Sequence, residues 1–305
     1  MKIAARMTYR FLYFFLLVFV LQSCDWFNKT PVEPQPTVTL PQFDTTPLVF
    51  PLQRGIVDEA SGIADSRNIP GNVWMHQDGG NLAAIYLFSS EGVFKKRINL
   101  PLQNRDWEDM AIGPGPEAGK NYIYIGEIGD NATVHNEYFI YRFLEPINAE
   151  TVPTQIDNIK FVYGDGKKYN AETLLLDPLT KDLYVITKGV FTEKIFMLKY
   201  PQSTSQTNTA EFMGTTQQFI LTAGEISADG QQILLKTYDT VLYWKLRTDE
   251  SIVQALGRLR DISAPYIREV QGEAICFPAN GKGYFTVSER AEQNVDIPLY
   301  FYRER

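Results

Sequence analysis

Short apolar segments separated by Gly, Asn, Asp and Pro dominate the chain after residue 58. These segments are rich in Val, Ile, Tyr and Phe, and few longer stretches carry apolar residues at helical spacing. Short runs of β-branched and aromatic residues bounded by turn residues are typical of strands. The pattern therefore predicts an all-β fold.

The expected strands repeat in units of four. The first four units cover residues 59–100, 108–163, 172–217 and 225–259, and each begins with a short segment headed by glutamate. A fifth unit has strands expected at 273–277, 283–288 and 299–302, so its fourth strand is missing. Four-stranded units repeating about every fifty residues are typical of propeller blades. Alternating aromatic residues in the second unit are predicted to pack between blades: Tyr122, Tyr124, Tyr138, Tyr141 and Phe143.

The incomplete last unit indicates how the ring closes. A propeller can close by pairing a strand from one terminus with the sheet formed near the other. The apolar segments 47–52 and 37–40 can each supply that strand. We therefore expect a five-bladed β-propeller closed by an N-terminal strand, with six blades as the alternative if the long spacing between the second and third units contains a further sheet.

The first 23 residues have the pattern of a secretory signal peptide. Three basic residues precede an apolar run at 11–21, which is too short to span a bilayer as a permanent helix. The run ends in Leu21-Gln22-Ser23-Cys24, which resembles a bacterial lipobox, although Gln22 departs from the small or aliphatic residue usual there. This resemblance implies lipidation of Cys24, and an ordinary secretory peptide is the alternative.

The segment that follows is rich in Pro, Thr and Gln, a composition that suits a flexible tether. The predicted organisation is a signal peptide at 1–23, a lipidated cysteine and tether at 24–50, and a propeller domain at 51–305. The expected location is the bacterial cell envelope, with the protein held to a membrane by its N-terminal lipid and facing the outer membrane or the periplasm.

The net charge and the cysteine content argue against a nucleic-acid partner and against a reactive thiol. The chain has a net charge of −7, and without residues 1–23, which hold three basic and no acidic residues, it has 26 basic and 36 acidic residues and a net charge of −10. This balance argues against a nucleic-acid partner, which requires a basic surface. Apart from Cys24, the chain has one cysteine, Cys276, whose apolar neighbours predict a buried, unreactive thiol.

The glutamates that head the five units are the main candidate site. In a propeller the first strand of each blade lines the central channel, so equivalent positions converge on one axis. Crowded carboxylates cannot all stay ionised without compensation, and a bound cation provides it. Oxygen ligands without clustered His or Cys favour Ca²⁺. The predicted ligands are Glu59, Glu108, Glu172, Glu225 and Glu273, while the alternative role for each is to cap the preceding turn.

Residues at the ends of the second strands should return to the same face. The lysines there, Lys188 and Lys236, provide an alternative compensation for the acids, and with Asp78 and Asp130 they are candidate ligand-binding residues. Glu127 and Glu289 are candidate catalytic acids. The chain has only two histidines, and His76 is predicted to pack in a strand. Few histidines are therefore left to form a Ser/His/Asp triad.

Two phrases early in the domain resemble a known family. Residues 59–64 (EASGIA) and 106–111 (DWEDMA) resemble paired motifs of the SdiA-regulated family of periplasmic β-propellers, and residues 273–275 with Ser288 and Glu289 look like the closing motif of phytase-like esterase propellers. These resemblances imply a bacterial propeller lipoprotein. By architecture alone, acid-headed blades around calcium are similar to calcium-activated nucleotidases.

Two functions follow from this interpretation. The first is a lipid-anchored binding or scaffold module whose acidic axial site holds Ca²⁺ and presents a polar face to a small molecule or an envelope protein. The second is a metal-dependent hydrolase of phosphate esters or lactones, in which Glu127 or Glu289 acts as the base.

Overall fold

The computed structural model describes residues 39–290 and 295–305. Residues 40–305 form one compact unit, which begins earlier than the predicted domain start at residue 51. The predicted signal peptide, Cys24 and most of the predicted tether lie outside the described residues. Within the described ranges, no helix is long and apolar enough to cross a membrane.

The described strands fall into five groups of four. The first group contains β2 (Ala60–Asp65), β3 (Asn72–Gln77), β4 (Ala84–Ser89) and β5 (Phe94–Asn99), and the second contains β6 (Trp107–Pro114), β7 (Asn121–Glu127), β8 (Tyr138–Leu144) and β9 (Asp157–Tyr163). The third contains β10 (Ala171–Leu176), β11 (Leu183–Thr187), β12 (Glu193–Leu198) and β13 (Asn208–Thr216). The fourth contains β14 (Leu221–Ile226), β15 (Gln232–Thr237), β16 (Val241–Lys245) and β17 (Ile262–Ala264). The last contains β18 (Gln271–Cys276), β19 (Gly283–Glu289), β20 (Pro298–Arg303) and β1 (Leu48–Pro51).

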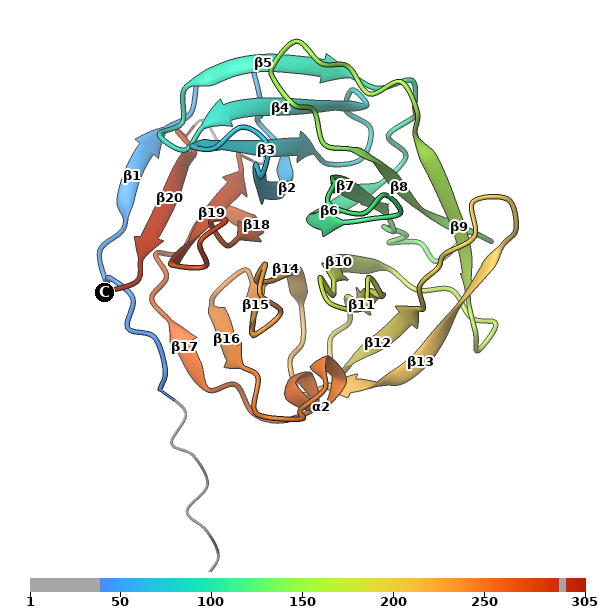
Figure 1. Cartoon of the computed structure of the whole chain (residues 1–305). Coiled ribbons are helices and arrows are strands. Elements are labelled where there is room, and N and C mark those ends of the chain that lie inside the picture. Colours follow the sequence, from blue (N-terminus) through green and yellow to red (C-terminus); the bar gives the residue numbers. More distant parts are fainter. Residues whose placement is uncertain (1–38, 291–294) are drawn as a thin grey trace, which may run out of the picture. The chain divides into compact units, whose positions relative to one another are not determined.

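Within residues 40–305 these groups surround a central axis, with β2, β6, β10, β14 and β18 innermost (Figure 1). Neighbouring strands within each group pair antiparallel. Every residue of β2, β10 and β14 is buried, the polar ones included, so these strands do not show the alternation of apolar and polar residues that a half-exposed strand has. The prediction of an all-β propeller is confirmed.

The N-terminal segment completes the last group, as predicted. Strand β1 pairs antiparallel with β20, with Leu48 opposite Phe301 and Pro51 opposite Pro298. Upstream of β1, Phe43 forms a bridge with Glu304 and packs edge-on against the rings of Tyr243 and Tyr284, with ring centroids 5.8 and 5.0 Å away. These contacts explain why the compact unit starts before residue 51.

The second and third groups are joined at their outer edges. Strand β9 pairs parallel with β13, with Asn208 opposite Phe161, so the two groups form one eight-stranded sheet. The connection between β9 and β10, residues 164–170, is described throughout and contains no strand. The alternative of a further sheet in this spacing has no strand to form it.

The fourth group differs from the sequence prediction in two places. The strand expected at 252–259 is wrong, because this segment contains helix α2 (Ile252–Gly257) and the fourth strand is the later β17. A capping box between Ser251 and Gln254 starts the helix, and its buried residues Ile252, Ala255 and Leu256 have helical spacing. In addition, β14 begins at Leu221, four residues before the expected start at Glu225.

Apolar clusters fill the spaces between neighbouring groups. Trp74 and Ile85 of the first group pack with Trp107 and Ile123 of the second in one cluster. The aromatic residues predicted to pack between blades all belong to such clusters: Tyr141 and Phe143 to this one, and Tyr122, Tyr124 and Tyr138 to the next. Cys276 is fully buried between the last and first groups, and burial raises its pKa well above the usual value, which confirms a buried thiol.

The closing segment yields a stability prediction. The Phe43→Ala substitution removes a ring that is 6% exposed, so we expect it to lower the free energy of unfolding by about 3–5 kcal/mol. The matched control is Val49→Ala in β1, where the side chain is 54% exposed and the expected loss is below about 1 kcal/mol. Urea denaturation of both variants checks this, and equal midpoints would show that the N-terminal segment does not contribute to closure.

Candidate acidic site at the central axis

Each innermost strand contains a β-bulge near its start. The register shifts leave one extra residue per strand: Ser61 in β2, Glu108 in β6, Glu172 in β10, Thr222 in β14 and Glu273 in β18. A bulge leaves its residue outside the ladder and redirects its side chain. These five positions are therefore structurally equivalent, and three of them carry glutamate.

Two of the five predicted ligands occupy other positions. Glu225 lies three residues after Thr222, and its carboxylate accepts a hydrogen bond from the Phe277 N–H and lies 3.8 Å from the Arg67 guanidinium. Arg67 also lies 3.8 Å from Asp65, the last residue of β2, so Glu225 belongs to the far ends of the innermost strands. The expectation that all five glutamates meet is wrong for Glu225, because the bulge in β14 falls at Thr222.

Glu59 lies at the rim of the site. It precedes β2, is exposed, and accepts a hydrogen bond of 2.5 Å from the Asn81 side chain. A bridge pairs Glu59 with Glu289 at the end of β19, so the two backbones run side by side. Glu59 therefore contributes negative charge near the axis from an exposed position.

Six carboxylates gather at the bulged ends of the innermost strands: Asp78, Asp106, Glu108, Glu172, Glu273 and Glu289. We call this set the axial acid cluster. Carboxylate oxygens of Asp78, Glu273 and Glu289 lie within 4.8 Å of one another, and so do those of Asp78, Asp106 and Glu108. Asp78 belongs to both triads. The structure thus brings together three predicted ligands, Glu108, Glu172 and Glu273, with the candidates Asp78 and Glu289, and Glu172 is the one of the three that belongs to neither triad.

Burial and mutual repulsion make the cluster hold protons. Burial, reinforced by Glu273 and Asp78, raises the pKa of Glu289 to about 10. Burial also raises the pKa of Asp78 to about 7, with Glu273 and Asp106 adding to the shift. The pKa of Glu108 is raised well above its usual value by burial and then by Glu172. The cluster therefore lacks positive charge for the number of acids that it contains.

Lys188 compensates one side of the cluster. Its ammonium group donates hydrogen bonds to the Glu172 carboxylate and to the Tyr238 hydroxyl, the latter at 2.7 Å. The Tyr238 hydroxyl in turn donates to Glu273 at 2.9 Å. Lys188 is thus in contact with the acids, as predicted for a compensating lysine, but its charge is used by Glu172. Burial still raises the pKa of Glu172 to about 7.

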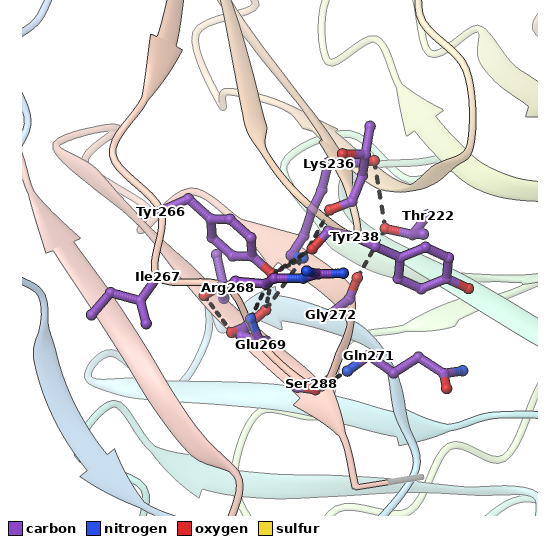
Figure 2. Close-up of polar contacts among 12 residues, drawn as sticks. Thr222, Lys236, Tyr238, Tyr266, Ile267, Arg268, Glu269, Gln271, Gly272 and Ser288 are labelled. Carbon is purple, nitrogen blue, oxygen red and sulfur yellow. Dashed lines mark hydrogen bonds and ion pairs between the residues drawn. The ribbon is translucent and has the colours of Figure 1, made fainter.

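Lys236 is fully buried and points toward Tyr266, Glu269 and Gly272 (Figure 2). Its ammonium group donates to the Tyr266 hydroxyl at 2.7 Å, to Glu269 at 3.2 Å and to the Thr237 carbonyl at 3.2 Å. A Cβ atom at Gly272 would overlap these groups, so glycine is required there. Because all three N–H groups have partners, Lys236 is placed as a structural ion pair and not as a residue open to a ligand.

Glu127 and Asp130 hold neighbouring structure in place. The Glu127 carboxylate accepts hydrogen bonds from Trp107 and Tyr141, at 3.1 and 3.0 Å, and pairs with Arg105 at 3.1 Å. Asp130 accepts hydrogen bonds from the backbone N–H groups of Val134 and His135 and from the Tyr138 hydroxyl, which fixes the loop after β7. Neither belongs to the two triads.

Asp106 and Asp109 are site residues that the sequence reasoning missed. Asp106 precedes Glu108 by two residues and joins one triad, so its signal was the spacing of the acids in Asp106-Trp107-Glu108-Asp109. Asp109 is fully buried and accepts hydrogen bonds from the backbone N–H groups of Met110, Leu174 and Gly224. It therefore ties together β6, β10 and β14. Nearby, His76 is buried against the Trp107 ring, which confirms the prediction of a packed histidine.

The residues present suit a cation with oxygen ligands. The buried Oε1 atom of Glu289 has no hydrogen-bond partner among the described residues. Gly79 lies against the carboxylate of Asp106, and Gly129 lies against those of Asp106 and Glu108; a Cβ atom at either glycine would overlap them, so the glycines allow these acids to pack close together. Carboxylate oxygens are the ligands that Ca²⁺ and Mg²⁺ prefer.

Two cavities lie away from the cluster, toward the far ends of the strands. One, of about 480 Å³, is lined by residues that include Arg142 and Asp157, and the other, of about 450 Å³, by residues that include Asp65 and Arg67. Neither lining includes a member of the axial acid cluster. The axial acid cluster is therefore not part of either cavity.

Comparisons with known proteins find only low-scoring structural similarities. No protein-family model matches the chain, and no curated protein matches it. Among solved structures, the Dos1 propeller is similar with a TM-score of 0.37 and 10% identity, over 79% of this chain and 68% of that one. A functionally unknown protein from Desulfotomaculum acetoxidans DSM 771 has a TM-score of 0.37 and 16% identity, over 75% of this chain and 65% of that one. At these scores neither structure identifies a ligand or an activity for this chain.

The raised pKa values predict how stability depends on pH. A carboxyl group whose pKa is higher in the folded protein than in the unfolded chain binds more protons when folded, so stability falls as pH rises. Without added cations we expect the melting temperature to fall from about pH 5, just above the unfolded pKa of about 4, through the values of about 7 for Asp78 and about 10 for Glu289.

Calorimetric scans at pH 5.5, 7 and 9 in a chelator measure this dependence. The Glu289→Gln variant, which carries no titrating group at that position, should show a shallower decrease between pH 7 and 9. A melting temperature that rises over this interval in the unmodified chain would contradict the assignment of protons to the cluster.

Proposed function

We propose that the axial acid cluster binds a divalent cation, with Ca²⁺ as its ion, and that the propeller is a binding or scaffold module built around this site. The observation that carries the proposal is the pair of carboxylate triads sharing Asp78, each with its oxygens within 4.8 Å of one another. Ligands of one Ca²⁺ ion lie about 2.3–2.6 Å from it, so such triads have the right spacing.

Several features favour Ca²⁺ over other ions. Both triads offer carboxylate oxygens only, which argues for a hard cation over zinc or copper. The ligands come from strands, from the loop after β3 and from the loop before β6, a spread that suits the large and variable coordination shell of Ca²⁺ better than the small octahedral shell of Mg²⁺. Lys188 is already used by Glu172, which leaves the two triads without a matching cation of their own.

The proposed setting is the bacterial cell envelope. In the first 24 residues, basic residues precede an apolar run that ends at Cys24, and this pattern supports lipid anchoring. The Pro-rich segment after Cys24 supports a tether. The resemblance of residues 59–64 and 106–111 to motifs of SdiA-regulated periplasmic propellers supports the same setting. The ligand presented at the acidic face is proposed to be a small molecule or another envelope protein, and the acidic charge argues against nucleic acid.

Calcium titration by calorimetry tests the binding function. We expect Glu108→Gln to lower the affinity for Ca²⁺ by at least about tenfold, equivalent to about 1.4 kcal/mol, because it removes a charged oxygen ligand. Glu225→Gln is the matched control, since Glu225 lies at the far strand ends beside Arg67, and its affinity should be unchanged. Equal affinities of Glu108→Gln and the unmodified chain would exclude this cluster as the calcium site.

Hydrolysis of phosphate esters or lactones is the second candidate function. It is favoured by Glu289, whose unpartnered Oε1 atom lies in the cluster and could accept a proton once a bound cation lowers the raised pKa of this group. Glu127 is a weaker base candidate, because Trp107, Tyr141 and Arg105 already occupy its carboxylate.

An activity screen with Ca²⁺ separates the two functions. A hydrolase should cleave an aryl phosphate ester or an aliphatic lactone, and Glu289→Gln should lower kcat at least about a hundredfold, the usual contribution of general base catalysis. Glu211→Gln, at an exposed position of β13, is the control that keeps activity. No turnover by the calcium-loaded protein would support the binding module instead.

A further inference from the structure

We propose that the axial acid cluster holds two divalent cations at once, bridged by the carboxylate of Asp78. This inference rests on the proposed cation-binding function and adds the number of ions and the ligands of each. Asp78, Glu273 and Glu289 would hold the first ion, and Asp78, Asp106 and Glu108 would hold the second.

The geometry separates the ligands into two groups. The described acids form two triads that share Asp78, and they do not form one group of five within the same distance. Two ligand oxygens on opposite sides of one Ca²⁺ ion are at most about 5 Å apart, because each Ca–O distance is at most about 2.6 Å. One ion therefore fits either triad but not the whole set.

Each triad contains a buried carboxylate without a hydrogen-bond donor. Glu289 is 5% exposed, and its Oε1 atom has no partner. Glu108 is also 5% exposed, and no hydrogen bond reaches its carboxylate from the part of the chain that the structure describes. A buried polar atom with no partner is costly, and coordination by a cation, which displaces any bound proton, removes that cost. The two unpartnered groups lie in different triads, which points to one ion in each.

Formal charge also favours two ions. The five acids of the triads carry up to five negative charges, none of them has a lysine or arginine as an ion-pair partner in the described ranges, and Lys188 is paired with Glu172 outside the triads. One divalent ion would leave three negative charges in excess, whereas two would leave one. Like charges crowded in a buried site repel strongly, and a second ion relieves the repulsion that bound protons relieve in its absence.

Two glycines allow the acids of the second triad to pack closely against the neighbouring loops. A Cβ atom at Gly129 would overlap the carboxylates of both Asp106 and Glu108, and a Cβ atom at Gly79 would overlap Asp106. Both glycines follow the ends of second strands, Gly79 after β3 and Gly129 after β7. The absence of side chains at these two positions therefore lets Asp106 and Glu108 come together in the second triad.

Stoichiometry decides between one ion and two. The chelator-treated protein is titrated with Ca²⁺ by calorimetry and with Mn²⁺ by electron paramagnetic resonance. We expect two ions per chain and the spectrum of a spin-coupled Mn²⁺ pair. Glu289→Gln and Asp106→Asn should each reduce the number to one with an isolated Mn²⁺ spectrum, and Asp78→Asn should weaken both sites. Glu211→Gln, with an exposed side chain, should keep two.

The outcomes separate the two proposals. One ion per chain with an isolated Mn²⁺ spectrum in the unmodified protein would overturn the paired site while leaving the proposed cation binding in place. No binding at all would overturn the proposed function itself. Circular dichroism of each variant shows whether it is folded, and the result for the unmodified chain decides the question even if a variant fails to fold.

Discussion

The site depends on one constraint: five strands must start close to a single axis, and side chains that leave the ladder there share one small space. A bulge at the same point of each innermost strand sets which residue this is. Where it is glutamate, in three of the five strands, a carboxylate is buried with others of its kind. Burial and repulsion then raise the pKa values, and the need for compensating charge follows from the geometry.

The protein compensates this charge unevenly. On the side of the third to fifth groups, a chain of hydrogen bonds runs from Glu172 through Lys188 and Tyr238 to Glu273. On the side of the first and second groups, Asp78, Asp106 and Glu108 have no lysine or arginine among their ion-pair partners in the described ranges. The acids of the first and second groups, together with the Oε1 atom of Glu289, are thus the part of the cluster that this hydrogen-bond chain leaves uncompensated.

Much of the fold could be predicted because repetition is visible in sequence. Strand-sized apolar runs, the missing fourth strand and the aromatic residues between groups each have a local signal. The helix α2 also had one, in the capping box of Ser251 and Gln254, but the apolar run was interpreted as a strand. The prediction for Glu225 fails for a different reason. The position of a bulge depends on pairing with the neighbouring strand, and no local sequence pattern indicates that position. Asp106 joins the site only through the loop that precedes β6.

The outer edges of the sheets have consequences for solubility. An unpaired edge strand can recruit another chain into the sheet, so proteins protect such edges. Here the parallel pairing of β9 with β13 removes two edges, which leaves β1, β5 and β17 outermost among the described strands. Strand β17 has only three residues, β1 has four and ends in Pro51, and β5 carries Lys95, Lys96 and Arg97 in succession. Shortness, proline and positive charge thus guard the three open edges against intermolecular sheet formation.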